Sequence, residues 1–189
     1  MAQTLLLVPL DDTVVFPTMD VTLPVDVAGE ERVLLVPRHE NEFAKVGTIA
    51  RVVETVRLPG GARGAQLEGE SRGVIVGAAE TDARGRLRVE VKEHVDDVPA
   101  NGRTRELERD YRAVVEEILE LRGDDGRVAA FLRSVVEPGP LADTSGYAPD
   151  LTFDQKVRLL EEVDVTKRLE LALQFQRERL TEMQVRRQI

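Results

Sequence analysis

The stretch Glu137-Pro138-Gly139-Pro140-Leu141-Ala142-Asp143 divides the second half of the chain. Proline lacks a backbone N–H and glycine relaxes φ, so this stretch ends whatever element precedes it. Proline is also favoured in the first turn of a helix, which predicts a short helix from Pro140 through Leu141 and Ala142 to Tyr147. The stretch therefore opens a series of helices that extends to the end of the chain.

Two more helices are predicted after this point. Thr152 and Gln155 have the spacing of a capping box, and Asp164 is a second N-cap candidate. From Val165 onward the apolar residues recur at helical spacing: Leu169, Ala172, Leu173, Leu180 and Met183. This helix has about 25 residues, or roughly 37 Å. No glycine or proline stops it, so we expect the chain to be truncated within it; the alternative is an ordinary C-terminal docking helix.

Helical periodicity also precedes the proline-rich stretch. We expect Thr104 to cap a helix with a broad apolar stripe: Leu107, Tyr111, Val114, Val115, Ile118 and Leu119. The segment Gly123–Gly126 breaks it, and a second helix is predicted from a further apolar group: Val128, Phe131, Leu132, Val135 and Val136. Residues 103–189 are thus expected to form a helical bundle that ends in a long helix.

The first half of the chain has the period of β-strands instead. Apolar and polar residues alternate in short runs separated by turn signals such as Asp82–Gly85. Pro24 cannot donate to a ladder, so its strand should lie at an edge or a bulge. We predict an α+β fold, in which a β-barrel-like subdomain of six or seven short strands (residues 1–98) precedes the helical bundle.

Several of these residues resemble a known family. Pro138-Gly139-x-Leu141-Ala142-Asp143, followed by Gln155-Lys156-x-x-Leu159-Leu160-Glu161 and Asp164-Val165-x-x-Arg168-Leu169, is similar to the end of the N-terminal domain of bacterial Lon proteases. Thr13-Val14-Val15-Phe16-Pro17 resembles that family's first loop, and Val46-Gly47-Thr48-Ile49-Ala50 resembles its middle strand. The order and spacing hold over nearly the whole chain. The resemblance implies a domain that recognises unfolded or degron-bearing protein substrates and supports assembly of a hexamer.

The resemblance also implies that this part of the protein is not catalytic. Full Lon chains are ATP-dependent serine endopeptidases, with an ATPase module and a protease that uses a serine–lysine dyad. This sequence contains neither module, so we expect no catalytic residue and no cofactor, with ATP and magnesium bound only by the absent ATPase module. The family usually places a helix near the turn at Gly29, where this chain has no room for one, and that puts part of the family's partner surface in doubt.

Composition restricts the possible classes of protein. Cysteine is absent, which excludes disulfides and thiolate metal sites. No apolar run approaches the roughly 18 residues of a membrane span, and the N-terminus lacks a basic signal region, so we expect a cytoplasmic protein without membrane contact. The net charge of −9 works against nucleic-acid binding.

Motifs for catalysis or metal binding are also missing. His39-Glu40 begins like a zinc-binding H-E-x-x-H motif, but Phe43 stands where the second histidine is needed, and we predict no metal site. Gly60-Gly61-x-x-Gly64 lacks the following Gly-Lys-[Ser/Thr] of a phosphate loop and is interpreted as a hairpin tip.

A receptor for unfolded chains needs accessible apolar residues. The candidates lie in the first loop and at the hairpin tip: Val15, Phe16, Pro17, Met19, Leu58 and Pro59. The first loop has two interpretations. Either Phe16-Pro17 is an anchor folded back on the core, or it is an exposed apolar tip that touches partners.

Two other functions are weighed against substrate recognition. One is a structural or oligomerisation module without client binding, in which the long helix acts as a strut. The other is a freestanding barrel that binds RNA, which the acidic charge and the shortage of aromatic residues disfavour.

Overall fold

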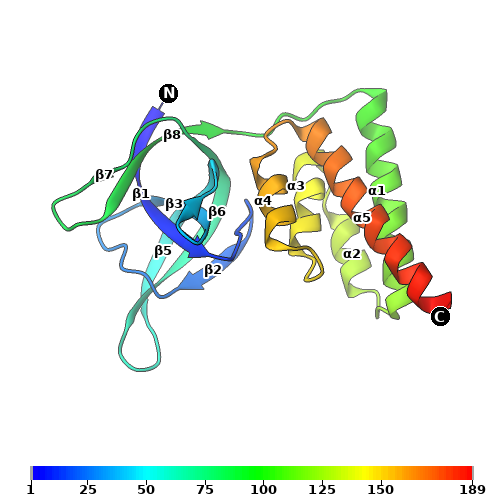
Figure 1. Ribbon diagram of the computed structural model, residues 1–189, viewed down its shortest axis with the longest axis horizontal. Coiled ribbons are helices and arrows are strands. Elements are labelled where there is room, and N and C mark those ends of the chain that lie inside the picture. The colour runs from blue at the N-terminus through cyan, green and yellow to red at the C-terminus, as the bar shows by residue number, and fades with distance from the viewer. Residues whose placement is uncertain (1, 189) are drawn as a thin grey trace. The chain divides into compact units, whose positions relative to one another are not determined.

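A computed structural model describes residues 2–188 and confirms the predicted α+β architecture (Figure 1). The chain divides into two compact units between Val95 and Asp96. Strands make up the first unit and helices the second, and the last strand ends at His94 before the first helix begins at Gly102.

The first unit contains eight strands among its described residues, one or two more than expected. Their bounds are β1 Ala2–Asp11, β2 Asp20–Leu23, β3 Arg32–His39, β4 Glu42–Phe43, β5 Val46–Arg57, β6 Arg63–Ile75, β7 Glu80–Thr81 and β8 Leu87–His94. They pair in the order β2-β6-β5-β3-β1-β8-β7, and β8 also pairs with β6, so that β6, β5, β3, β1 and β8 form a ring (Figure 1). The barrel-like arrangement expected from the alternating pattern is therefore present, and β2, which ends before Pro24, lies at an edge.

The long strand β6 corrects one sequence-based expectation. The alternating pattern predicts only short strands, but β6 runs without interruption for 13 residues. Its glycines allow close packing instead of ending the strand. A Cβ at Gly73 would lie 2.6 Å from the Val91 side chain and 2.7 Å from that of Leu34, so only glycine fits against the core there.

Apolar clusters cover both faces of the sheet. The β3 residues Val33–Val36 are completely buried, as in a strand that is covered on both sides and so is apolar throughout. One cluster includes Leu34, Ile49 and Val91. The other is completed by Val15 and Val27, which come from the segment between β1 and β3. The crossover that joins these two parallel strands is therefore part of the core.

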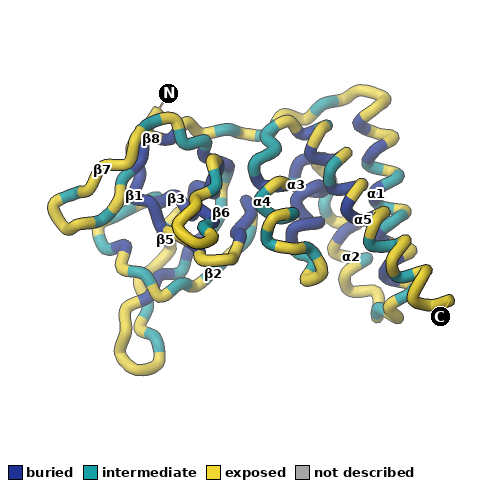
Figure 2. Tube along the Cα trace, in the orientation of Figure 1, coloured by how far each residue is buried: buried dark blue, intermediate teal, exposed yellow. Residues whose placement is uncertain are grey.

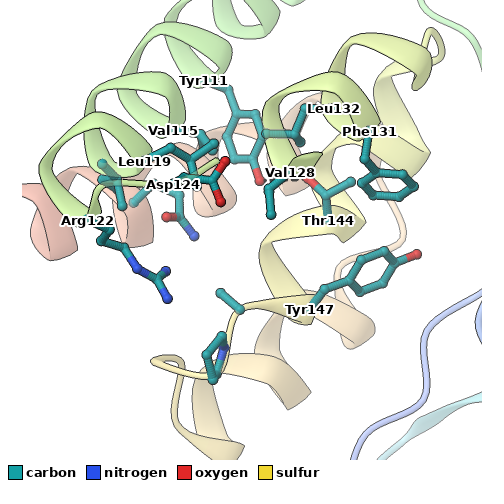
Figure 3. Close-up of a pocket in the computed structure, with 14 residues that line it drawn as sticks. Tyr111, Val115, Leu119, Arg122, Asp124, Val128, Phe131, Leu132, Thr144 and Tyr147 are labelled. Carbon is teal, nitrogen blue, oxygen red and sulfur yellow. Dashed lines mark hydrogen bonds between the residues drawn. The ribbon is translucent and has the colours of Figure 1, made fainter. Parts of the chain in front are cut away.

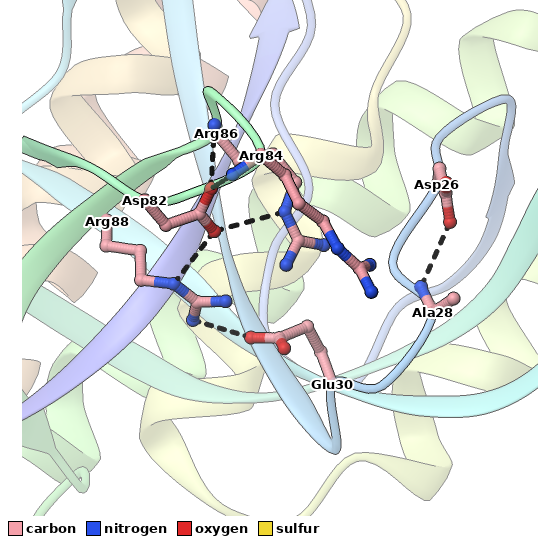
Figure 4. A network of polar contacts seen from close by, with 7 residues as sticks. All are labelled: Asp26, Ala28, Glu30, Asp82, Arg84, Arg86 and Arg88. Atoms are coloured by element: carbon pink, nitrogen blue, oxygen red, sulfur yellow. Dashed lines mark hydrogen bonds and ion pairs between the residues drawn. The ribbon is translucent and has the colours of Figure 1, made fainter.

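A charged network fastens the turn between β7 and β8 (Figure 4). The Asp82 carboxylate accepts hydrogen bonds from the backbone N–H groups of Arg84 and Arg86, at 2.9 and 3.0 Å. It also accepts one from Arg88 Nε at 3.1 Å, and Arg88 in turn donates to Glu30 at 2.7 Å. The backbone hydrogen bond from Arg86, followed by the other donors, lowers the pKa of Asp82 to about 2. The predicted turn at Asp82–Gly85 is thus also tied to the loop before β3.

The second unit is a helical bundle, as predicted. Its elements are α1 Gly102–Arg122, α2 Arg127–Ser134, α3 Pro138–Asp143, the 3₁₀ helix Thr144–Tyr147, α4 Phe153–Glu161 and α5 Val165–Gln188. The long helices α1 and α5 pack along one another, and α3 also packs on α5 (Figure 1). The short helix predicted at Pro140 is thus an α-helix followed by a 3₁₀ turn.

Two of the three predicted helix caps are present. Thr152 and Gln155 form the capping box of α4, with reciprocal hydrogen bonds of 3.1 and 2.9 Å. Asp164 Oδ1 accepts from the Lys167 backbone N–H at 3.0 Å at the start of α5. The predicted cap of α1 is wrong. Asn101 takes that position and accepts the Thr104 backbone N–H at 2.8 Å, while Thr104 is buried inside the helix.

Helix α2 differs more from expectation. It ends at Ser134, before two of the apolar residues assigned to it, and Leu132 is its only buried residue. Val128 is 44% exposed and Phe131 48% exposed, so most of the predicted apolar stripe faces solvent. Large apolar side chains that gather in solvent often mark a binding surface.

A buried arginine connects the proline-rich stretch to α5. Arg168 is completely buried, and its Nη1 and Nη2 atoms each donate to one oxygen of Asp96 at 2.8 Å. Its Nε donates to the Glu162 carbonyl at 2.8 Å, and Nη1 lies 3.6 Å from Asp143 Oδ1. Burial by itself would lower the pKa of Arg168, but its bonds to Asp96 and the charge of Asp143 outweigh burial and raise it. A Cβ at Gly139 would overlap the Asp96 carboxylate, which explains a glycine between two prolines.

Candidate functional site

The first-loop residues proposed from the sequence are buried. Phe16 has no exposed surface, Val15 is 2% exposed, and Pro17 is also buried. The interpretation of this loop as an exposed apolar tip is therefore wrong, and the loop is an anchor folded back on the core. Met19 is only partly buried, but it packs against the same core.

Contacts distant in sequence hold this loop in place. Thr48 Oγ1, itself buried, donates to the Val15 carbonyl. Gly69 exchanges backbone hydrogen bonds with the loop, because its N–H donates to the Met19 carbonyl at 2.8 Å and its carbonyl accepts from Thr18 at 3.0 Å. A Cβ at Gly69 would lie 2.8 Å from the Phe16 carbonyl oxygen. The apolar side chains are turned inward because the backbone of the loop pairs with β6.

The hairpin-tip candidates lie elsewhere. Pro59 is exposed, whereas Leu58 is partly buried and lies against Gly64, where a Cβ would meet its side chain at 3.0 Å. Gly64 and Gly69 are five residues apart on β6, or about 16 Å at the rise of a strand. The structure thus does not join the tip and the first loop into one surface, and substrate binding by Leu58 and Pro59 stays a prediction.

An apolar groove in the helical unit has the geometry of a binding site (Figure 3). Its volume is about 440 Å³, within the usual range for ligand pockets. The floor is formed by α1, chiefly by the buried side chains of Tyr111, Val115 and Leu119. The lip is formed by Phe131 of α2 and by Tyr147, whose rings lie 6.4 Å apart. The groove therefore joins a buried floor to an aromatic edge in solvent.

The polar groups at the floor of the groove are already paired. The Tyr111 hydroxyl lies 2.8 Å from Thr144 Oγ1, which donates to the Leu141 carbonyl at 2.6 Å. Gln176 Nε2 donates to Ser145 Oγ at 2.6 Å. An occupant need not satisfy these groups, so the groove suits an apolar side chain better than a polar one.

The buried Tyr111 leads to a prediction about alkaline pH. Burial raises the pKa of Tyr111 to about 12, from 10.0, although the hydrogen bond with Thr144 works in the opposite direction. Because its pKa is higher in the folded state than in the unfolded state, neutral Tyr111 contributes its full share to the free energy of unfolding below pH 10. This share is lost as the pH rises towards 12. In a Tyr147→Phe variant Tyr111 is the only tyrosine, so the absorbance of tyrosinate near 295 nm should titrate close to pH 12.

The control for this titration is Tyr111→Phe, which leaves only Tyr147. In this variant the free energy of unfolding of the helical unit should no longer show the decrease between pH 10 and 12 that Tyr111 causes. A titration of the Tyr147→Phe variant near pH 10, with circular dichroism still that of the folded protein, would show that Tyr111 is accessible to solvent.

The chain is similar to known proteins over nearly its whole length. Residues 4–176 match the family model described as the ATP-dependent protease La (LON) substrate-binding domain. This chain belongs to that family. The Lon protease of Salinispora arenicola is 36% identical over 98% of the chain, and the Lon protease of Mycolicibacterium smegmatis is 32% identical over 97%. In both cases the match covers 25% of the relative, so the chain spans about a quarter of the length of these proteins.

Solved structures agree with this placement. The N-terminal domain of the Lon protease from the Mycobacterium avium complex is 31% identical, with a TM-score of 0.78 over 92% of this chain and 98% of that domain. The Lon N-terminal domain protein from Xanthomonas campestris is 18% identical and has a TM-score of 0.66 over 90% of this chain and 97% of that one, which shows a shared fold.

This Lon substrate-binding domain has the features of a binding surface. Residues 2–188 contain no cluster of three or more histidine, aspartate or glutamate side chains arranged for a metal ion. Over the same residues every helix is too short or too polar to cross a membrane. What the arrangement offers is an apolar surface with paired polar groups, which suits binding.

The sequence pattern does not predict the groove of this Lon domain. Val128, Phe131 and the α1 stripe all have helical spacing, and that spacing shows only that a face is apolar, not whether another element covers it. Only the structure shows that α2 is short, with eight residues, and that Leu132 alone among them is buried.

Proposed function

We propose that this chain recognises unfolded or degron-bearing protein substrates for an ATP-dependent Lon-type protease, through the groove between α1, α2 and Tyr147. The observation that carries the proposal is the apolar lip, where Phe131 is 48% and Val128 44% exposed beside a pocket of about 440 Å³. Unfolded chains expose large apolar side chains, and this groove gives one of them a buried floor and an aromatic edge. The family description as a substrate-binding domain supports the same role.

The expected affinity is low. Burying one large apolar side chain contributes about 1.5–3 kcal/mol, and immobilising the bound segment offsets part of this. A single chain should bind in the micromolar range or weaker. An assembly that presents several grooves would bind one client much more tightly through effective concentration.

The test replaces Phe131 with serine. Phe131 is about half exposed already, so a client completes only about half of its burial, and the variant should bind an unfolded protein about three- to tenfold more weakly. The measurement is an NMR titration with reduced, carboxymethylated α-lactalbumin. Shifts of the wild-type protein should map to the groove.

The matched control is Phe43→Ser. Phe43 is 37% exposed and lies in the first unit, so its replacement should leave client binding unchanged. Equal binding by the Phe131→Ser variant, or wild-type shifts confined to the first unit, would contradict the proposal.

We assign catalysis to parts of the parent protein beyond this chain. The chain spans about a quarter of the length of two Lon proteases, and the resemblance to the family implies that an ATPase module and a serine–lysine protease belong to the rest of such proteins. The cytoplasmic location and the absence of nucleic-acid partners stay predictions from composition.

Self-association into a hexamer also stays a prediction, and one feature of α5 favours it. The helix has no buried residue after Gln176 within its described part (Figure 2), and this stretch includes Val185, which is 53% exposed. These turns offer a surface for a neighbouring copy or for other parts of the parent protein. Sedimentation velocity of the wild-type chain and of Val185→Asp tests for contact between copies.

A further inference from the structure

We propose that the groove distinguishes its clients by the charge that flanks the apolar residue, and that it favours segments flanked by lysine or arginine over segments flanked by aspartate or glutamate. This inference rests on the proposed function, because it names the class of substrate that the same groove accepts. It follows from a polar extension of the groove and from the charges around both parts.

The groove continues into a second hollow of about 270 Å³, which is lined by α1, by α5 and by the segment before α4. The two share Ile118, Arg122, Ala148 and Gln176, so they form one surface. Apolar side chains dominate the first part, whereas the second is lined by polar groups of α5 and of the segment before α4. A bound segment that places an apolar residue beside Phe131 would therefore place the neighbouring residues in the second hollow.

Carboxylates outnumber arginines along this surface. The charged lining residues are Arg122, Arg179, Asp124, Asp150, Glu178 and Glu182. Asp150 holds both arginines, at 3.7 Å from Arg122 Nη1 and 3.2 Å from Arg179 Nη2. Glu182 also lies 3.8 Å from Arg179. Both arginines thus already face a carboxylate, which weakens their attraction for a carboxylate of the client.

The remaining two carboxylates have no cationic partner among the described residues. Asp124 accepts the Gly126 backbone N–H at 2.9 Å, and Glu178 accepts from Gln174 Nε2 at 3.1 Å. They stand on the α1–α2 loop and on α5, which line different parts of the groove. A lysine or arginine beside the apolar anchor would meet one of them, whereas an acidic residue would be repelled.

One buried donor beside the second hollow lacks an acceptor among residues 2–188. Arg179 Nε is buried and has no hydrogen-bond partner in the described part of the protein. A buried donor without a partner is uncommon, and a peptide carbonyl supplies an acceptor without adding negative charge.

The test compares three labelled twelve-residue peptides with the same central Phe-Leu pair and with lysine, serine or glutamate flanks. Fluorescence anisotropy with the wild-type chain at low salt should give the order lysine, serine, glutamate. Exposed charge pairs are weak, so the lysine peptide should bind about three- to tenfold more tightly than the glutamate peptide. Raising the salt to about 1 M shortens the screening length to about 3 Å and should bring the three affinities together.

Two variants locate the effect. Asp124→Asn combined with Glu178→Gln should reduce the difference between the lysine and glutamate peptides to less than about twofold, while the serine peptide binds as before. Glu120→Gln is the matched control, because Glu120 is exposed and lies on the far side of α1 from the groove at 3.6 residues per turn. It should leave all three affinities in the same order and ratio.

The outcomes separate this inference from the proposed function. Equal binding of the three peptides, each weakened by Phe131→Ser, would overturn the charge preference and leave substrate recognition in place. A preference that survives the double variant would also overturn it, because the charges responsible would lie elsewhere. Binding that is unaffected by Phe131→Ser, or absent for every peptide, would overturn both proposals.

Discussion

Replacing Arg168 with alanine is expected to destabilise the helical unit by about 3–5 kcal/mol, because it leaves the carboxylates of Asp96 and Asp143 without their buried cation. Asp143 is 2% exposed, so water can hydrate its carboxylate only poorly once the arginine is removed. The variant also removes the donors to the carbonyls of Glu162 and Val163, which precede α5. Urea unfolding followed by circular dichroism at 222 nm measures the change.

The control lies on the same helix. The Arg177 side chain is 58% exposed and 3.6 Å from Asp110, so Arg177→Ala should change the free energy of unfolding by less than about 1 kcal/mol. Asp96→Ala should also be destabilising, and the double variant should lose less than the sum of the single losses, because both remove the same bonds. Arg168→Ala with no greater effect than Arg177→Ala would show that the buried ion pair does not support the fold.

Replacing Phe16 with alanine should destabilise the first unit by about 3–5 kcal/mol, the usual loss when a buried aromatic side chain leaves a cavity. Phe16 is completely buried, and the loop around it is held by Thr48 and Gly69, so the site cannot collapse freely. The first unit should therefore unfold at a lower urea concentration than in the wild-type chain. Amide hydrogen exchange across residues 12–19 should accelerate as well.

Phe43 provides the comparison within the same unit. It is 37% exposed and lies beneath the Arg38 guanidinium at 5.5 Å, so Phe43→Ala should cost about 1 kcal/mol or less. If Phe16→Ala were no more destabilising than Phe43→Ala, the loop would not be part of the core. The interpretation of Phe16 as a contact for partners would then be open again.

Features that depend on neighbours along the chain could be read from the sequence. The change from strand to helix periodicity near residue 100 and the long final helix require only the side chains within a few turns. The capping box of Thr152 and Gln155 and the turn at Asp82 also depend on residues only a few positions apart. The cap of α1 could not be predicted in this way, because Asn101 and Thr104 are both acceptable caps. The helix begins after the earlier one, Asn101.

The candidate site could not be read in the same way. The apolar runs around Phe16 and Phe131 look alike in sequence, yet Phe16 is completely buried and Phe131 is half exposed. The difference comes from partners far along the chain. Gly69 pairs with the Phe16 loop across about fifty residues, whereas Val128 and Phe131 of the short helix α2 are only about half covered.

By itself the sequence determined which segments form strands or helices and which of their faces are apolar, because backbone propensity and side-chain period are local properties. Only the tertiary structure decided which apolar faces are covered. Burial depends on which distant backbone, such as that of Gly69 or Asp96, approaches closely enough to hold a segment in place. The groove of this Lon domain exists because α1 packs along α5, while Val128 and Phe131 of α2 remain about half exposed.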